Sequence, residues 1–346
     1  MRKQCRVMVT GAGSGVGQAI FKALRASTLP VTLVAADITP MNAALYRADE
    51  AVIIPRVEEA NALEHTIELL LQHRIDVVMI GSEFDLEFFS LYKTEIESRA
   101  SVLVIVAPPE TVAIANDKWL TAEFLRESGL PYAEAYLPKS QEDALHKAKE
   151  WGFPVVLKTR RGTSSRHVHI VRDTESLEQL FPGMPLPMLQ RMIDTPSSEL
   201  TNEYTCSVFK TADGNLVGPF TARRTVRGGT SWHIEVAAFE ELYAPLLLIA
   251  DALDFVGSLN IQLMLTSHGA IPFELNSRFS GTTAVRANFG FNEPEMALLS
   301  FFYEEPIPVP EIRGGVAMRY HEEVFIENTN ASNLALSDKA VVNNWF

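Results

Sequence analysis

A polar-faced strand pair near residue 270 constrains the fold of this chain more than any other segment. Residues 260–265 and 271–278 are rich in β-forming residues, and the connection between them ends in glycine. This composition predicts a β-hairpin. Because side chains alternate between the faces of a strand, Glu274 and Asn276 share one face, and Gln262 lies opposite them if the polar faces pair.

These three side chains predict a metal site. Gln262, Glu274 and Asn276 offer only hard oxygen ligands, which suit Mg²⁺, with Mn²⁺ as a substitute, rather than zinc. Arg278 follows on the same side and would face the anion that the metal holds. The alternative is an ordinary hairpin with one solvated face. The apolar character of both strands weighs against it, because an uncompensated carboxylate beside a buried sheet is costly.

Length and composition bound the class of protein. The chain has 346 residues, 47% of them hydrophobic and 21% charged, which is enough for two or three globular domains. Its net charge of −13, without a lysine-rich or arginine-rich run, predicts no nucleic-acid partner. The two cysteines, Cys5 and Cys206, lie in no CxxC motif, so we expect neither a disulfide framework nor a zinc site.

The sequence shows no targeting signal or membrane-spanning segment that we recognise. Residues 1–5 lead straight into a strand-like segment and do not resemble a signal peptide. No apolar run reaches the ~18 residues that a membrane helix needs. We therefore expect a cytoplasmic protein with no membrane partner.

The first forty residues predict a Rossmann-like unit. A strand at 6–10 is followed by the glycine-rich turn 11–17, a helix to residue 26, and a strand that ends at Asp37. The glycine spacing resembles the fingerprint of short-chain dehydrogenases, so an NAD(P)-dependent oxidoreductase of the short-chain type is the main alternative function. That family would require a Tyr-x-x-x-Lys pair, and none of the eight tyrosines has lysine four residues on. We therefore prefer the interpretation that these glycines permit a tight turn and do not bind a dinucleotide.

The polar hairpin also carries a family resemblance. Residues 273–284 resemble the metal-binding strand of ATP-grasp enzymes, and 257–262 resemble the preceding strand in the carbamoyl-phosphate-synthase-large-chain-like branch of carboxylate–amine ligases. The resemblance implies an α/β chain in which a Rossmann-like, pre-ATP-grasp domain precedes an ATP-grasp fold of two α+β subdomains. The implied bounds are 1–112 for the first domain, 113–310 for the ATP-grasp domain with a mobile lid at about 132–192, and 311–346 for a peripheral tail.

The resemblance also implies a nucleotide site. Asn-Asp-Lys before a helix, a strand ending in lysine, and a polar loop after it match the family's phosphate-binding segments. That loop has one glycine where the family has many, and serine hydroxyls would compensate. The implied ATP contacts are Lys118, Lys158, Ser164 and Ser165 for phosphates, backbone groups of Gln190, Arg191 and Met192 for adenine, and Glu203 for ribose.

The chemistry implied by the family is ATP-dependent activation of a carboxylate as an acyl phosphate, which an amine then captures. Arg278, Lys158 and Asn276 would be catalytic, and Mg²⁺ would be held by Gln262, Glu274 and Asn276. The partners would be small carboxylate and amine substrates, and a homodimer is compatible with this assignment. A non-catalytic nucleotide-binding module is the third alternative.

Two departures narrow the substrate. Carbamoyl phosphate synthases carry an arginine where this chain has Gly281, and biotin carboxylases carry a glutamate where it has Thr282. Bicarbonate chemistry is therefore disfavoured, and we expect a small amino-acid or peptide carboxylate. Outside these motifs, we expect a basic loop at 225–233, a long helix at 240–255, and a last strand at 315–320.

Overall fold

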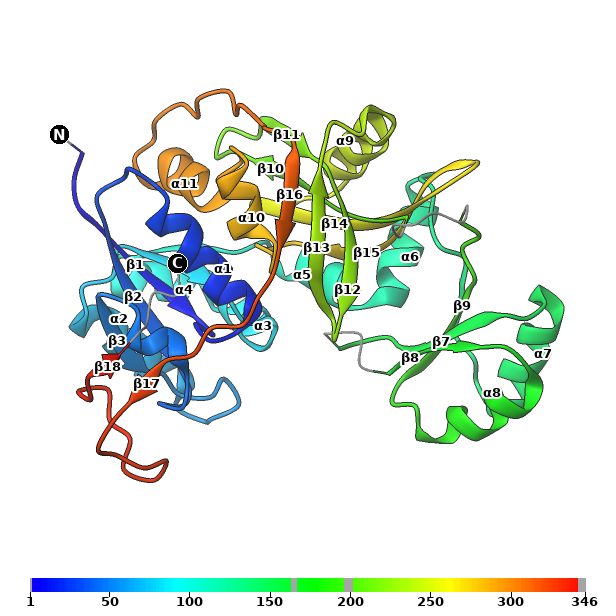
Figure 1. Ribbon diagram of the computed structural model, residues 1–346, viewed down its shortest axis with the longest axis horizontal. Coiled ribbons are helices and arrows are strands. Elements are labelled where there is room, and N and C mark those ends of the chain that lie inside the picture. The colour runs from blue at the N-terminus through cyan, green and yellow to red at the C-terminus, as the bar shows by residue number, and fades with distance from the viewer. Residues whose placement is uncertain (1, 163–166, 196–201, 342–346) are drawn as a thin grey trace.

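The computed structural model describes residues 2–162, 167–195 and 202–341. An N-terminal domain lies at one end, a small domain at the other, and a large antiparallel sheet runs between them (Figure 1). Residues 340–341, near the end of the described chain, lie beside the N-terminal domain (Figure 1).

The N-terminal domain is a parallel five-stranded sheet in the order β3-β2-β1-β4-β5. Its central strands β1 and β4 are buried along almost their whole length because helices cover a parallel sheet. The strands are β1 (Cys5–Thr10), β2 (Val31–Asp37), β3 (Glu50–Ile53), β4 (Val77–Ile80) and β5 (Leu103–Ile105). The helices are α1 (Gly15–Arg25), η1 (Ala43–Tyr46), α2 (Ala62–Gln72), α3 (Glu83–Leu91) and α4 (Lys93–Ala100).

Two helices lead into the small domain, α5 (Pro109–Asn116) and α6 (Lys118–Glu127). Asp117 caps α6 by accepting hydrogen bonds from the amides of Trp119 and Leu120, as its side-chain type predicts. The small domain is a four-stranded sheet in the order β6-β9-β7-β8 with two helices. Its elements are β6 (Ala135–Tyr136), α7 (Gln141–Trp151), β7 (Val155–Thr159), β8 (Val168–Val171), α8 (Thr174–Leu180), η2 (Phe181–Gly183) and β9 (Pro187–Arg191).

The large sheet has seven strands in the order β15-β14-β10-β12-β13-β16, with β11 pairing β10. They are β10 (Glu203–Lys210), β11 (Leu216–Phe220), β12 (Ala222–Arg227), β13 (Thr230–Val236), β14 (Gly257–Thr266), β15 (Gly269–Asn276) and β16 (Gly315–Met318). The remaining elements are η3 (Glu240–Leu242), α9 (Tyr243–Ala252), α10 (Thr283–Asn288), α11 (Glu293–Ala297), the π-helical η4 (Leu298–Phe302), β17 (Phe325–Ile326) and β18 (Ala340–Val341).

Three expectations need correction. Residues 225–233 are not a loop but a hairpin of β12 and β13 around a two-glycine turn. The long helix at 240–255 shortens to η3 and α9, because Leu253 is already extended although it stays buried. The boundary at residue 310 is also wrong, because β16 from the expected tail pairs with β13 in the large sheet.

The small domain has its own hydrophobic core. Eight buried residues, among them Val155, Leu157 and Leu189, form a cluster separate from the two larger ones. Those larger clusters each combine residues of the N-terminal domain with residues of the large sheet. The N-terminal domain and the large sheet therefore pack as one body, to which the small domain adds little shared core. Within the described ranges, no helix has the length and apolarity to cross a membrane.

Candidate active site

A cavity of about 500 Å³ opens where the three parts of the chain meet. The N-terminal domain contributes the turn before α1 and the start of α3, the small domain contributes β7, β8 and β9, and the large sheet contributes β10, β12, β14 and β15. The cavity walls include Lys118, Lys158, Glu203, Glu274 and Arg278. Gln190, Met192 and Gln262 line it as well, so eight of the predicted site residues, which are far apart in sequence, border one cavity.

The hairpin register brings the predicted metal ligands together. Gln262 pairs with Glu274, and Asn260 pairs with Asn276, across β14 and β15. Glu274 Oε1 accepts hydrogen bonds from Gln262 Nε2 at 3.0 Å and from Asn276 Nδ2 at 3.1 Å. Strand alternation placed these three side chains on one patch, as the sequence predicts.

The donor set fits Mg²⁺ with one qualification. A carboxylate and the amide oxygen of Asn276 are hard ligands, and rotation of the Asn276 amide presents its oxygen to a cation at Glu274. Gln262 fits less readily, because its Oε1 accepts a hydrogen bond from Arg224 NH2 at 2.7 Å. Among the described residues, no group of three His, Cys, Asp or Glu could hold a metal, so phosphate oxygens would have to complete the coordination.

Lys158 is a buried amine next to this patch. Only 5% of it is exposed, and Nζ donates to Gln190 Oε1 at 2.5 Å. Burial lowers the pKa of Lys158 to about 7, and the positive charge of Lys118 contributes, while Glu274 opposes the shift. The amine is therefore poised to take up a proton when an anion enters the cavity.

This lowered pKa predicts a pH-dependent stability. The pKa of an unfolded lysine is about 10.4, so the unfolded chain binds the extra proton between about pH 7 and pH 10. The penalty of burying charged Lys158 is fully present below pH 7 and disappears as the pH rises towards 10. Lys158→Met should therefore raise the melting temperature more at about pH 6 than at about pH 10. An equal gain at both pH values would contradict the lowered pKa.

Lys118 reaches the cavity from the first residue of α6. Its Nζ donates to the carbonyl oxygen of Gly162 at 2.9 Å, and its backbone amide donates to Arg160. The cation therefore lies beside the polar loop that follows β7. Ser164 and Ser165, predicted to bind phosphate in that loop, lie outside the described residues.

The three residues predicted to contact adenine have different surroundings in the structure. Gln190 uses its side chain to hold Lys158, and Met192 lines the cavity just beyond β9. The amide of Arg191 donates to the carbonyl of Glu134 at 2.8 Å and its guanidinium pairs with the same residue at the surface, so a base contact by Arg191 would have to use its carbonyl oxygen. β9 is an interior strand whose backbone is engaged by its neighbours, which propensity alone does not reveal.

Glu203 opens β10 and faces the cavity as predicted, but it has a partner. Arg224 donates to Glu203 Oε1 from Nε at 2.9 Å and from NH2 at 2.5 Å. Arg224 thus joins Glu203 to Gln262 in one polar row across the sheet. A ribose hydroxyl would have to share this carboxylate with the guanidinium.

Arg278 joins the large sheet to the N-terminal domain. Its NH2 forms an ion pair with Glu83 at the start of α3, and its NH1 donates to the carbonyl of Phe279 at 2.8 Å. Burial lowers the pKa of Arg278 to about 10, so the guanidinium stays charged at neutral pH. Glu83 is thus an ion-pair partner, and Ser82 caps α3 by accepting from the amide of Phe84.

Sequence reasoning missed Arg319 as a cavity residue. It follows β16, its amide donates to the carbonyl of Trp232 at 3.0 Å, and its NH2 donates to the carbonyl of Gly281. A guanidinium therefore lies beside the position at which this chain lacks the arginine of carbamoyl phosphate synthases. A single arginine in an expected tail gave no signal, because only the pairing of β16 with β13 brings it here.

The glycine-rich turn of the N-terminal domain is closed by its own side chains. Asp37 accepts from the Gly13 amide at 3.1 Å and from Asn42 Nδ2 at 2.7 Å. A Cβ atom added at Gly13 would meet the Asn42 side chain at 1.6 Å, so Asn42 fills the space above the turn. The acid that a dinucleotide-binding enzyme offers to ribose is therefore occupied.

Comparisons with known sequences agree with this geometry. Residues 7–105 match the family model described as PylC-like, N-terminal domain. The chain is 24% identical over 307 residues to the carbamoyl phosphate synthase large chain of Pyrococcus furiosus, covering 81% of this chain and 28% of that protein. It is 22% identical over 308 residues to the large chain of Sulfolobus acidocaldarius, with 81% and 29% covered. The chain thus spans less than a third of either large chain.

Solved structures decide the fold. An ADP complex of purK, N5-carboxyaminoimidazole ribonucleotide synthetase, superposes with a TM-score of 0.72 at 18% identity over 91% of this chain and 80% of that one. The chain has an ATP-grasp fold. The biotin carboxylase domain of the Hydrogenobacter thermophilus 2-oxoglutarate carboxylase, a dimer complexed with MgADP, gives 0.71 at 17% identity over 91% and 74%. The predicted ATP-grasp resemblance is confirmed, and the oxidoreductase alternative finds no support in these comparisons.

Proposed function

We propose that this ATP-grasp protein is an ATP-dependent carboxylate–amine ligase. The observation that carries the proposal is one cavity that joins two lysines, the Glu274–Asn276 patch and Arg278. In the first step a substrate carboxylate oxygen bonds to the γ-phosphorus of ATP, and the bond to the β-γ bridging oxygen breaks, which yields ADP and an acyl phosphate. In the second step an amine nitrogen bonds to the acyl carbon, phosphate leaves, and the amine loses a proton.

In one half of the cavity, the residues would bind the nucleotide and its metal. Lys118 and Lys158 would bind phosphate oxygens, Met192 would border the base, and Glu203 would contact ribose. Glu274 and Asn276 would hold Mg²⁺, or Mn²⁺ in its place, with Gln262 joining when its amide turns from Arg224. The bound metal supplies charge neutralisation on the phosphates. Phosphoryl transfer needs little covalent help from a protein, so these residues act by position and charge.

The other half of the cavity favours an anionic substrate. Arg278 and Arg319 each donate to a carbonyl of residues 279–282, and the Nε atom of each is buried without a partner among the described residues. Paired guanidinium groups suit a carboxylate. Arg319 supplies a cation beside Gly281, yet Thr282 still replaces the glutamate of biotin carboxylases. We therefore retain a small amino-acid or peptide carboxylate as the substrate and a small amine as its acceptor.

Nucleotide preference is the first test. Thermal shift with Mg-ATP should raise the melting temperature, because a ligand that binds only the folded state stabilises it. NADP should have no effect, because Asn42 fills the turn at Gly13. Stabilisation by NADP without stabilisation by Mg-ATP would reject the ligase and restore the oxidoreductase alternative.

Turnover separates the ligase from a non-catalytic nucleotide-binding module. Pairs of carboxylates and amines are screened for amine-dependent release of ADP and phosphate. The proposal expects stoichiometric release of both products with at least one pair. A homodimer, the state named for the Hydrogenobacter domain, is part of the proposal and is tested by light scattering.

A further inference from the structure

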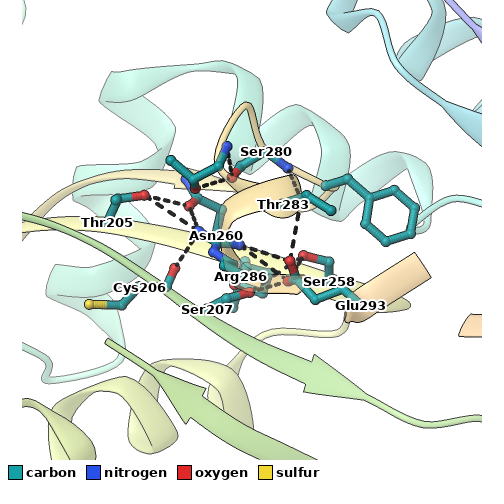
Figure 2. A network of polar contacts seen from close by, with 12 residues as sticks. Thr205, Cys206, Ser207, Ser258, Asn260, Ser280, Thr283, Arg286 and Glu293 are labelled. Carbon is teal, nitrogen blue, oxygen red and sulfur yellow. Dashed lines mark hydrogen bonds and ion pairs between the residues drawn. The ribbon is translucent and has the colours of Figure 1, made fainter. Parts of the chain in front are cut away.

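A fully buried ion pair lies directly behind the floor of the cavity. Arg286 on α10 and Glu293 at the start of α11 are both 0% exposed, and Arg286 NH1 lies 3.1 Å from Glu293 Oε2. Figure 2 shows both residues at the centre of a network that joins β10, β14 and the segment after β15. Removing two charges from water costs several kcal/mol per ion, and their mutual attraction offsets this penalty only in part or just fully. A buried ion pair is therefore weak evidence for a role in stability.

The acidic partner connects the strands beneath the cavity. Glu293 Oε1 accepts hydrogen bonds from the hydroxyls of Ser207 on β10 and Ser258 on β14, the latter at 2.5 Å. Its other oxygen accepts from Thr283 Oγ1 at 3.3 Å. One carboxylate thus fixes two neighbouring strands relative to the segment that follows β15 (Figure 2).

The basic partner reaches the cavity floor through Asn260. Arg286 NH2 donates to Asn260 Oδ1 at 2.5 Å, and Thr205 Oγ1 donates to the same oxygen at 3.0 Å. A guanidinium has only donors, so it determines which end of the amide faces it. The Asn260 oxygen is therefore turned away from the cavity.

The amide nitrogen of Asn260 remains to face the ligand. Asn260 lines the cavity and is the strand partner of Asn276, the proposed metal ligand. The described residues include no acceptor for Asn260 Nδ2. Asn276 is different, because its nitrogen is bonded to Glu274 and rotation of its amide presents the oxygen to a cation, whereas the oxygen of Gln262 accepts from Arg224.

We propose that Asn260 Nδ2 is a hydrogen-bond donor to an anionic phosphoryl oxygen, and that Arg286 and Glu293 are positioning residues that hold the amide in this orientation. The inference rests on the proposed ligase function. The oxygen belongs either to the γ-phosphate of ATP or to the acyl phosphate formed from it, since both bring the same chemistry next to the metal ligands. A donor fixed before the ligand arrives stabilises that oxygen without reorganisation.

Asn260→Asp tests the donor. One carboxylate oxygen still accepts from Arg286, while the other places negative charge where the NH₂ group was. If the donor serves the γ-phosphate, Mg-ATP affinity measured by calorimetry should fall at least ~10-fold, the scale of a charged hydrogen bond, while Mg-ADP affinity stays within about twofold. If it serves the acyl phosphate, Mg-ATP affinity stays and ADP release falls at least ~10-fold. Asn288→Asp on α10, away from the cavity lining, is the matched control and should change neither.

The positioning role is tested by a double-mutant cycle. Arg286→Met with Glu293→Gln removes both charges together, so no unpaired buried charge is left. In that background Asn260→Asp should lose most of its effect, to less than about threefold, because the amide is free to turn. If Asn260→Asp has the same effect in the double variant as in the wild-type protein, the ion pair has only a structural role. If the double variant does not fold, Arg286→Lys serves instead, because a shorter side chain with one nitrogen replaces the separate NH1 contact to Glu293 and NH2 contact to Asn260. Unchanged Mg-ATP affinity and ADP release in that variant would overturn the positioning role.

The outcomes separate this inference from the proposed function. Wild-type protein that binds no Mg-ATP rejects the proposed function itself. Wild-type protein that binds Mg-ATP, with an Asn260→Asp variant that is equal to it in nucleotide affinity and in ADP release, rejects only the donor.

Discussion

Glu274→Gln should lower phosphoryl transfer by at least ~100-fold, the scale of losing ~2.7 kcal/mol of transition-state stabilisation. Glutamine keeps the size of the side chain, and its oxygen can still accept from Gln262 and Asn276, which now bond to Glu274 Oε1. The variant should therefore fold with similar stability. It lacks the single negative charge of the patch, which is the strongest attraction that this site offers to Mg²⁺.

ADP release over a range of Mg²⁺ concentrations, with thermal unfolding as the check on folding, measures this effect. Asn276→Ala should act in the same direction. Glu240→Gln, at the exposed first residue of η3, is the matched control and should do little. Near-full ADP release by Glu274→Gln at saturating Mg²⁺ would return the hairpin face to an ordinary polar surface.

Lys158→Ala should weaken Mg-ATP binding and abolish turnover while the fold stays intact. The buried amine should take up a proton when a phosphate enters, and the charge so created would lie in a site from which water is largely excluded. Losing it removes a contact that strengthens as charge develops on the transferred phosphoryl group. Calorimetry should also detect proton uptake by the wild-type protein on binding above pH 7, and the variant should lack it.

The comparison for this variant is Lys149→Ala on the exposed face of α7, which should leave affinity and turnover unchanged. Circular dichroism and thermal unfolding establish that both variants are folded. A folded Lys158→Ala protein with wild-type nucleotide affinity would show that this lysine is only a structural residue of β7.

Local sequence determined the elements that carry the site. Alternation along two β-rich segments fixed which side chains of the β14–β15 hairpin share a face, because a slip of one residue would reverse every side chain. Asp117 predicted the start of α6, because its carboxylate satisfies amides that the first helical turn leaves free. Family resemblance then ordered lysines, acids and amides into one predicted site.

Pattern reasoning failed where burial continued past the end of an element. Leu253 and Phe255 are buried in the core, so the apolar pattern runs on after α9 has ended. The bonded amide of Arg191 was also not predicted, because β9 is an interior strand of its sheet. Neither the end of a helix within the core nor the place of a strand within a sheet is encoded in a short window of residues.

The sequence by itself determined the hairpin face, the Rossmann-like unit and the order of the candidate ligands, because each depends on periodicity or on contacts between near neighbours. Only the tertiary structure decided which side chains the cavity residues contact. Arg224 is bonded to Glu203 and Gln262, Arg278 is paired with Glu83, and Arg319 is brought in by the pairing of β16. These contacts join segments that the sequence keeps apart, and their geometry depends on how sheets and helices pack. The ion pair beneath Asn260 belongs to the same class, since Arg286 reaches β10 and β14 only after the chain has folded.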